Sequence, residues 1–444
     1  MIDPDTIAAP VTPPGYGGVG IVRVSGPAAG AIAAAVAPPL PSPHRAALRH
    51  FRDSAGVAID EGLVLWFPGP GSYTGEDSVE FHGHGGPAVI DALYARTLEL
   101  GARPARAGEF TERAFLNGRL DLAQAEAVAD LIESGDAAGA RAAMRSLEGA
   151  FSRRVHALRD ELTALRAWIE AALDFPEDEI DFLADTALRD RLDALIADLA
   201  DTRASAAEGR RLVEGLTVVI AGAPNAGKSS LLNALAGADS AIVTDIAGTT
   251  RDVLRESIRL DGVPLTLLDT AGLRATDDPV ESEGVRRARA ALAEADRVLL
   301  VIDSAADAGA ETPELPPGAI VDTVRTKIDL TDESAGVTET EQGRVFRLSA
   351  VTGEGLDALR AHLRTLLGTG PEGGAFSARR RHLDALDRAA EEIRAARAEL
   401  VETGAGELAA ERLRQAQTAI GAITGETTTE DLLGEIFSRF CIGK

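Results

Sequence analysis

One glycine-rich segment constrains the possible folds of this 444-residue chain more than any other feature. Residues 222–229 read GAPNAGKS, directly after the apolar run Leu216–Ala221 and before the helix-like stretch Ser230–Ala236. In this order of strand, loop and helix, backbone N–H groups and the N-terminus of the helix bind a polyphosphate. Lys228 is expected to reach the β and γ phosphates, and the Ser229 hydroxyl to bind Mg²⁺. The segment predicts a P-loop nucleotide-binding domain.

Length and composition leave room for several folded domains. About three are expected from the length, and a hydrophobic content of 45% can supply several cores. No apolar run approaches the length of a membrane span, and the acidic start lacks the apolar stretch of a signal peptide. The single cysteine, Cys441, excludes an internal disulfide and fits a reducing compartment. We therefore expect a cytoplasmic protein with no membrane partner.

The charge of the chain limits how it can bind nucleic acid. A net charge of −25 argues against a broad basic surface, because Lys and Arg supply most of the non-specific affinity for phosphate. If RNA is the substrate, we expect a partner to supply basic surface. Three of the 45 basic residues are lysines, Lys228, Lys327 and Lys444. The compact point charge of lysine suits a phosphate site, although chance retention of these three is the alternative.

Composition divides the chain into four segments. Residues 1–118 are rich in Gly and Pro with strand-like runs, which predicts a compact α/β domain. Residues 119–212 and 373–444 carry apolar residues at helical spacing. Because an amphipathic helix must bury its apolar stripe, we expect both segments in one bundle rather than in two independent hairpins. Residues 213–372 alternate strands and helices, as in a mostly parallel sheet, and are then an insertion into that bundle.

A cluster of histidines and carboxylates lies within the first segment. Asp77, Glu80, His82 and His84 stand close together in the sequence, which invites a metal site. Their spacing fits no standard zinc pattern and no cysteine is nearby, so turn and hydrogen-bonding roles are favoured.

Further motifs of a nucleotide site follow the glycine-rich loop. Residues 269–272 (DTAG) end an apolar strand, where Asp269 can bind Mg²⁺ through water and the Gly272 amide can sense the γ-phosphate. Residues 248–252 (GTTRD) are a candidate switch loop in which Thr250 can complete the Mg²⁺ shell.

The base-recognition motif is at residues 326–329 (TKID), after another strand. Asp329 can accept hydrogen bonds from guanine N1 and the exocyclic amine, and Ser349-Ala350 ends the last strand. Several motifs in the correct order, each at a strand end, predict GTP rather than ATP. The expected nucleotide-binding residues are Asn225, Ala226, Gly227, Lys228, Ser229, Ser230, Thr244, Thr249, Thr250, Asp269, Thr270, Ala271, Gly272, Thr326, Lys327, Asp329, Ser349 and Ala350.

This sector resembles the translation-factor-related branch of small Ras-like GTPases, with two departures. Thr326 stands where the motif usually has Asn, and a hydroxyl replaces only part of the bonding of an amide. Leu273 stands where Ras-like enzymes have the glutamine that orients the attacking water. Hydrolysis therefore needs another acid or amide and a positive charge near the β–γ bridge. The acid candidates are Asp277, Asp278, Glu281 and Glu283, and the candidate arginine fingers are Arg251 and Arg274.

Motifs outside this sector point to one family. They are residues 5–9 (DTIAA), 12–15 (TPPG), 108–117 (GEFTERAFLN), 120–126 (LDLAQAE) and 440–444 (FCIGK). Together they resemble the bacterial and organellar family of tRNA-modification GTPases called MnmE or TrmE, over essentially the whole chain. A prenylation signal is excluded, because the residues that end the chain do not match one.

The resemblance implies an N-terminal folate-binding and dimerising domain and a helical domain split by the GTPase domain. It also implies a homodimer that assembles with the FAD-binding partner MnmG (GidA) into a heterotetramer or larger complex. The two proteins add a carboxymethylaminomethyl or aminomethyl group to carbon 5 of the wobble uridine of certain tRNAs. The one-carbon unit comes from 5-formyl- or methylene-tetrahydrofolate. Matching positions suggest Arg23, Glu80 and Arg119 as folate contacts, and relatives usually have lysine at the last of them.

The resemblance also supplies the missing catalytic groups. In the family, K⁺ at the interface between two GTPase domains provides the charge of an arginine finger. Asn225 matches the K⁺-binding asparagine, with Thr244, Ile246 and Thr249 as further oxygen donors. Glu281 matches the acid that orients the attacking water. Cys441 is either a nucleophile near the folate or an inert cysteine.

Two other functions fit parts of the sequence. A ribosome-assembly GTPase would share the nucleotide motifs, but no basic Gly-x-x-Gly loop or aromatic-rich basic stretch is present. The second is a regulatory switch with negligible hydrolysis, which Leu273 by itself would favour because it cannot orient water. GTP hydrolysis that K⁺ stimulates would argue against such a switch.

Overall fold

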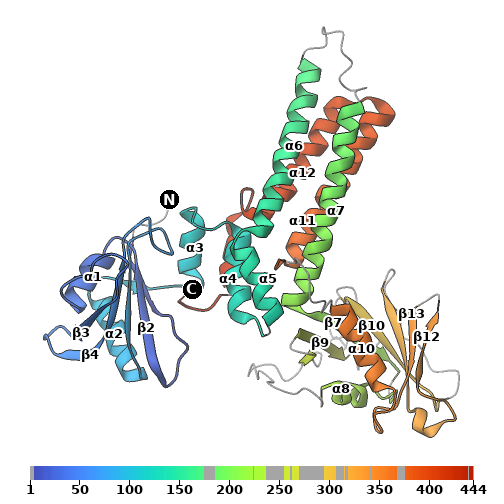
Figure 1. The fold of residues 1–444 in the computed structure, drawn as a ribbon, viewed down its shortest axis with the longest axis horizontal. Helices are drawn as coiled ribbons and strands as arrows, with labels where there is room; N and C mark the ends of the chain where they lie inside the picture. Colours follow the sequence, from blue (N-terminus) through green and yellow to red (C-terminus); the bar gives the residue numbers. More distant parts are fainter. Residues whose placement is uncertain are drawn as a thin grey trace, which may run out of the picture. The chain divides into compact units, whose positions relative to one another are not determined.

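The computed structural model describes residues 5–135, 137–174, 186–223, 225–236, 255–260, 263–269, 295–306, 315, 319–340, 343–367, 376–438 and 440–443. Contacts divide the chain into two compact units. Unit 1 comprises residues 1–129, 145–200 and 384–444, and unit 2 comprises residues 130–144 and 201–383. Figure 1 labels helices and strands of both units where there is room.

Unit 1 begins with a six-stranded sheet in the order β3-β4-β5-β2-β1-β6. The side chains of its strands alternate between a buried face and an open face, as the period of two requires. Helices α1 (Ala29–Val36) and α2 (Pro87–Glu99) cover the buried face, where Val22, Val64 and Phe81 are fully buried (Figure 1). The strands are β1 (Ile7–Pro10), β2 (Gly17–Ser25), β3 (Ala47–Arg52), β4 (Ala58–Phe67), β5 (Ser78–Gly85) and β6 (Arg103–Pro104). The α/β domain expected near the N-terminus is confirmed.

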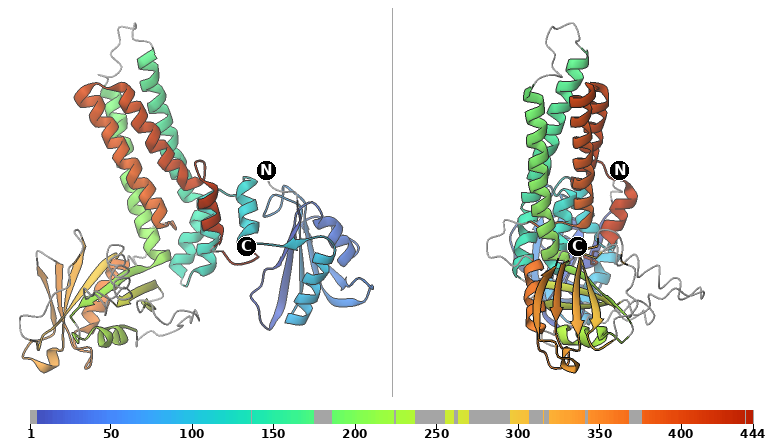
Figure 2. Two further views of the ribbon diagram at one scale, coloured as in Figure 1. Left: turned by 180° about the vertical axis from the view of Figure 1, so that it is seen from behind. Right: turned by 90° about the vertical axis from the view of Figure 1, so that its right-hand side faces the viewer.

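Helices from both ends of the chain form one bundle. Figures 1 and 2 show α6 (Ala150–Asp174), α7 (Thr186–Glu214), α11 (Arg380–Ala398) and α12 (Gly406–Thr424) side by side. The Arg166 guanidinium donates to the Gln417 side-chain oxygen at 2.7 Å, and Arg397 pairs with Asp193. The expected single bundle is therefore confirmed over two independent hairpins. The other helical elements are α3 (Glu109–Leu116), α4 (Leu122–Glu133), α5 (Ala137–Leu147), the π-helical turn η2 (Glu399–Thr403) and α13 (Glu430–Ser438).

Unit 2 contains a seven-stranded sheet in the order β12-β13-β11-β10-β7-β9-β8. The five central strands are parallel, as the alternation of strands and helices predicts. Both edge strands, β8 and β12, run antiparallel to their neighbours and were not predicted, because their sequences are largely polar. The strands are β7 (Leu216–Gly222), β8 (Arg255–Leu260), β9 (Val263–Asp269), β10 (Arg297–Asp303), β11 (Val321–Thr326), β12 (Gly336–Thr340) and β13 (Gly343–Arg347).

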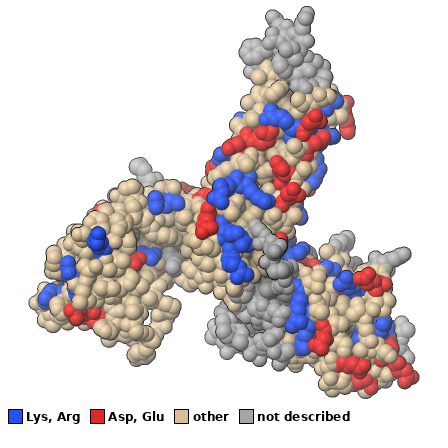
Figure 3. Space-filling view, viewed as in Figure 1, with Lys and Arg blue, Asp and Glu red and all other residues tan. Residues whose placement is uncertain are grey.

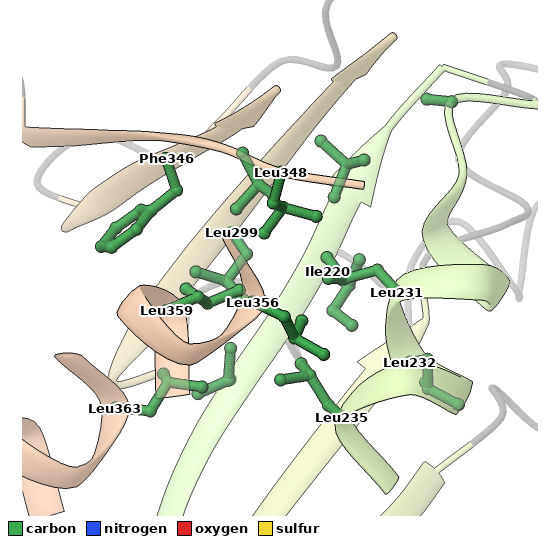
Figure 4. Packing of buried hydrophobic residues seen from close by; sticks show 14 of the residues in the cluster. Ile220, Leu231, Leu232, Leu235, Leu299, Phe346, Leu348, Leu356, Leu359 and Leu363 are labelled. Atoms are coloured by element: carbon green, nitrogen blue, oxygen red, sulfur yellow. The ribbon is translucent and has the colours of Figure 1, made fainter. Parts of the chain in front are cut away.

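Two helices pack against the same face of this second sheet. Figure 4 shows leucines of α8 (Lys228–Ala236) and α10 (Leu356–Leu367) around Ile220 of β7 and Leu299 of β10. Every labelled residue of this cluster is at most 5% exposed. The core therefore holds the start of α8, and with it the glycine-rich loop, against the ends of the central strands.

The chain enters and leaves this sheet through adjacent connections. Helix α7 leads directly into β7, and a Cβ on Gly209 of α7 would overlap the carbonyl oxygen of Phe376, which lies on the returning segment. Asp296 accepts a hydrogen bond from the Thr217 amide at 3.0 Å and pairs with Arg210 at the end of α7. This arrangement suits an insertion, and the four segment boundaries given above stay a prediction.

Charged side chains are mixed over the visible surface. In Figure 3, Lys and Arg lie in small groups among Asp, Glu and uncharged residues. Among the described helices, none is long and apolar enough to cross a membrane.

Candidate functional site

The glycine-rich loop connects β7 to α8 in unit 2. Gly227 has φ +92° and Asn225 has φ +63°, a left-handed conformation that residues other than glycine seldom adopt. Lys228 is 7% exposed, and its ammonium donates to the carbonyl oxygens of Gly222 at 3.0 Å and Ala223 at 2.9 Å. Ser229 and Ser230, in the first turn of α8, are exposed. The loop thus presents two hydroxyls and a helix N-terminus beside a lysine that its own carbonyls hold.

The base-recognition motif contacts this loop directly. The buried Thr326 hydroxyl donates to the carbonyl oxygen of Ala226 at 2.6 Å. The next residue, Lys327, donates from its ammonium to the carbonyl oxygen of Asn225 at 2.7 Å. Sequence reasoning treated Thr326 only as a weakened base contact, whereas the structure assigns its hydroxyl to the phosphate loop.

The other motif residues in the described part of the chain lie at the same edge of the sheet. Asp269 ends β9 in register with Ile220 of β7, two residues before Gly222. Asp329 is exposed in the 3₁₀ turn η1 (Ile328–Leu330). The buried Ser349 accepts a hydrogen bond from the Thr352 amide at 3.1 Å, and Ala350 follows it. The parallel strands therefore bring the separate motifs together, as their positions at strand ends require.

Several expected site residues lie outside the described residues. They are Thr244, Ile246, Thr249, Thr250, Thr270, Ala271, Gly272 and Glu281, together with Leu273 and the other candidate acids and arginine fingers. Their roles stay predictions.

Asp303 was not anticipated as a site residue. It ends β10 in register with Thr326, and its carboxylate accepts a hydrogen bond from the Lys327 ammonium at 2.7 Å. That bond is the main cause that lowers the pKa of Asp303, against the opposing effect of burial. Its position at the end of an apolar strand was the available signal.

A second polar site lies on the open face of the N-terminal sheet. The Arg23 guanidinium of β2 donates to the Glu80 carboxylate of β5 at 2.9 Å, and His82 donates to the other carboxylate oxygen at 2.9 Å. Burial raises the pKa of Glu80, but the His82 hydrogen bond and the charge of Arg23 outweigh it and hold that pKa below its ordinary value. The rings of Tyr73 and Phe110 each lie 5.5 Å from the guanidinium carbon. Two of the three expected folate contacts are thus in direct contact.

The histidine cluster needs one correction. Glu80, His82 and His84 lie in strand β5, not in a turn, because their alternation with small and apolar residues suits a sheet with one open face. Their hydrogen-bonding roles are confirmed, since His84 bonds Asp60 at 2.8 Å. Among the described residues, no group of three or more His, Cys, Asp and Glu side chains could hold a metal ion.

The end of the chain reaches this second site. Ile442 forms a bridge with Ala107, and the Gly108 amide donates to the Cys441 carbonyl oxygen at 3.3 Å. The Gly443 carbonyl oxygen lies 3.5 Å from an Arg23 nitrogen. Cys441 is exposed. Cys441, the candidate nucleophile, therefore lies two residues from a contact of the Arg23–Glu80 pair.

Arg119 occupies a different place. Its stem carbons lie over Gly75, 3.2 and 3.5 Å from where a Cβ would stand, in the loop that also carries Tyr73. The described contacts do not join Arg119 to the Arg23–Glu80 pair. The structure therefore places Arg119 beside the loop of this site and not in the pair itself.

Comparisons with known proteins decide the family. A family model described as the GTP-binding protein TrmE N-terminus matches residues 6–119, and one described as the MnmE helical domain matches residues 122–441. The tRNA modification GTPase MnmE of Pseudomonas paraeruginosa is 57% identical over 452 residues, which cover 99% of both chains. The chain belongs to the MnmE family of tRNA modification GTPases. The MnmE of Alkalilimnicola ehrlichii is 56% identical over 446 residues, again with 99% of both chains covered.

One solved structure resembles a part of this MnmE-family chain. A crystal structure of an Aquifex aeolicus Era variant bound to GDP·AlF₄⁻ is 25% identical, with a TM-score of 0.24. The likeness covers 40% of this chain and 66% of Era.

Proposed function

We propose that this chain hydrolyses GTP and, with a FAD-dependent partner, adds an aminomethyl or carboxymethylaminomethyl group to carbon 5 of the wobble uridine of tRNA. The observation that carries the proposal is the 57% identity to an MnmE protein over 99% of both chains. The direct contact of the base-recognition motif with the phosphate loop supports it. Different elements of the chain build the nucleotide site and the folate site.

The nucleotide site fits GTP and Mg²⁺. The exposed hydroxyl of Ser229, at the start of α8, is an oxygen ligand of the kind that Mg²⁺ prefers, and Thr250 would supply a second. Bound Mg²⁺ would neutralise charge that develops on the phosphates. Asp269 lies at the strand end where it can hold a metal-bound water, and exposed Asp329 is free to accept hydrogen bonds from guanine. Lys228 would exchange its loop carbonyls for phosphate oxygens.

Potassium and Glu281 would complete hydrolysis in place of the missing glutamine. Asn225 fits the first role, because it is exposed at the tip of the loop and its own carbonyl is already held by Lys327. Thr244, Ile246 and Thr249 would supply further oxygens. Bound K⁺ would contribute positive charge near the β–γ bridge. Glu281 would orient the attacking water.

The second site fits a tetrahydrofolate. A carboxylate that accepts hydrogen bonds, a guanidinium and the partly exposed ring of Tyr73 suit a flat, amino-substituted heterocycle that also carries carboxylates. Arg23 and Glu80 would make the direct contacts, with Arg119 near the rim. The folate would supply the one-carbon unit when bound. Cys441, exposed in the same neighbourhood, is the candidate nucleophile.

The proposed partners follow from the family and from the acidic charge of the chain. They are a second copy of the chain, the FAD-binding MnmG, and tRNA in the cytoplasm. With a net charge of −25, this chain is expected to leave most of the tRNA backbone to MnmG. The proposed domains are residues 1–118, 119–212, 213–372 and 373–444.

The test is nucleoside mass spectrometry of tRNA from cells that lack this protein. We expect the modified wobble uridine to disappear and to return with the wild type. Neither Lys228→Ala nor Glu281→Ala should restore it, because the first loses phosphate binding and the second loses hydrolysis. Unchanged nucleosides in the null strain would favour a ribosome-assembly GTPase instead.

A further inference from the structure

A chain of polar contacts runs from the end of β10 to the tip of the phosphate loop. The Lys327 ammonium donates to the Asp303 carboxylate and to the Asn225 carbonyl oxygen, at 2.7 Å in each case. The second Asp303 oxygen accepts from the Ala305 amide at 2.9 Å. Asp303 is thus fixed to its own turn on one side and holds the lysine on the other.

The two ends of the lysine contact share an unusual backbone. Asn225 has φ +63° and Lys327 has φ +60°, and each is a residue other than glycine in the left-handed region. Among the described residues, the only other such residue is His44, which is not part of the site. Conformations of this kind persist where surrounding contacts enforce them, and they concentrate at functional sites. A hydrogen bond that joins two of them indicates that each helps to fix the other.

A free lysine would not hold this position. Its side chain loses considerable rotamer entropy when it is fixed, and its side chain here remains 33% exposed to competing water. The Asp303 carboxylate, itself 19% exposed, supplies the charge that keeps the ammonium over the loop. Two of the three lysines in the chain, Lys228 and Lys327, therefore bond carbonyls of the same loop.

We propose that Asp303 is a positioning residue for GTP turnover, which acts through Lys327 on Asn225 and so on the shape of the phosphate loop. The inference rests on the proposed GTPase function of the same site. Asp303 touches neither the phosphates nor the base in this assignment. Its loss should alter nucleotide kinetics much more than it alters stability, because ion pairs that remain partly exposed to water contribute little to folding.

The test compares Asp303→Asn with Glu333→Gln in the full-length protein. Glu333 pairs with Arg325 of β11 and accepts a hydrogen bond from the Ser304 hydroxyl at 3.4 Å. Among the described residues it has no contact with the phosphate loop, so it controls for the loss of a nearby carboxylate charge that does not reach the loop. We expect Asp303→Asn to speed dissociation of a fluorescent GDP analogue about 5- to 10-fold, as loss of a charged hydrogen bond implies. The kcat of GTP hydrolysis should fall as well, and the Tm should change by no more than about 4 °C. Glu333→Gln should match the wild type in all three measurements.

A double-variant cycle tests the route through the lysine. In a Lys327→Met background, Asp303→Asn should have no further effect on nucleotide dissociation, because the carboxylate then has no ammonium to hold. Equal dissociation rates for Asp303→Asn and the wild type would overturn the inference, as would additive effects of the two substitutions. A wild-type protein that binds no guanine nucleotide would instead overturn the proposed function.

Discussion

The Thr326 hydroxyl donates a 2.6 Å hydrogen bond to the carbonyl oxygen of Ala226, and both residues are buried. The bond joins two motifs that are 100 positions apart in the sequence. A Cβ on Gly227 would lie 3.2 Å from the same hydroxyl oxygen, so the loop passes close against Thr326. The residue at this position therefore supports the loop, whatever it contributes to the base.

Replacing Thr326 with Val should weaken nucleotide binding. Valine keeps the shape of threonine but leaves the Ala226 carbonyl without its donor, at a cost of about 1–3 kcal/mol for a buried group. We expect the Kd for GDP to rise about tenfold or more in isothermal titration. Thr326→Ser retains the hydroxyl and should stay near the wild type. If both variants bind equally well, the hydroxyl has no supporting role.

Replacing Glu80 with Gln should weaken folate binding. The substitution removes the charge that pairs with Arg23 and accepts from His82, and with it the fixed geometry of the second site. The expected loss of affinity for 5-formyltetrahydrofolate is about tenfold, measured by fluorescence titration. Glu61→Gln, on the neighbouring strand in a pair with His50 at 3.7 Å, is the matched control. If Glu80→Gln binds 5-formyltetrahydrofolate as tightly as this control does, Glu80 is not a folate contact.

The local parts of the nucleotide site could be predicted from the sequence pattern, whereas the long-range contacts of both sites could not. The strand, loop and helix around Lys228 follow from apolar runs and glycines within one stretch of chain. The contact of Gly443 with Arg23 joins residues 420 positions apart, and the spacing of apolar residues along the chain does not predict such a contact. The contact of Asp303 with Lys327 could not be predicted for the same reason, because it depends on the register of β10 with β11. The edge strands were missed because the prediction relied on apolar runs, and short polar sequences such as that of β12, in which Val337 is the only large apolar residue, contain none.

Acid should lower the stability of unit 2 by protonating Asp322, which lies near the start of β11. This carboxylate is 1% exposed, and it accepts from His362 at 2.8 Å and from the Arg344 amide at 3.1 Å. Burial raises the pKa of Asp322, but these hydrogen bonds and the charges of His362 and Arg297 lower it overall. A carboxyl whose pKa is lowered by folding stabilises the protein above its unfolded pKa of about 3.9. That contribution is lost as the pH falls through the lower pKa of the folded state.

Hydrogen exchange, corrected for the intrinsic rate, can follow this loss in β11 and α10. As the pH falls from 5 toward 3, protection should decrease more in the wild type than in Asp322→Asn. At pH 7, Asp322→Asn should be about 1–3 kcal/mol less stable than the wild type, because His362 and Arg297 lose the carboxylate charge of Asp322. Asp357→Asn removes a carboxylate that is 97% exposed in the same unit, and it should leave the acid response unchanged. An identical acid response in wild type and Asp322→Asn would contradict the assignment.

Two helical glycines should respond to alanine with opposite signs. Alanine normally stabilises a helix relative to glycine by about 1 kcal/mol. At Gly434 in α13, a new Cβ would meet no atom within 4 Å, so Gly434→Ala should be neutral or stabilising. At Gly209 in α7, the Cβ would overlap the Phe376 carbonyl oxygen, which is backbone on the segment that returns from the sheet. That segment is also tied by the hydrogen bond from the Ser377 amide to the Ala142 carbonyl oxygen at 3.1 Å.

Neither the backbone of α7 nor that of the segment at Phe376 can move without breaking other contacts. Gly209→Ala should therefore lower the free energy of unfolding by about 1–3 kcal/mol, although alanine has the better helix propensity. The loss of stability should appear as a lower Tm and as faster hydrogen exchange in β7, the strand that directly follows α7. Gly434→Ala should leave exchange in β7 unchanged. A Gly209→Ala protein at least as stable as the wild type would mean that the two connections are not held together. Because β7 leads directly into the phosphate loop, a loosened junction should also raise the KM for GTP, which ties the geometry of the insertion to the function of the site.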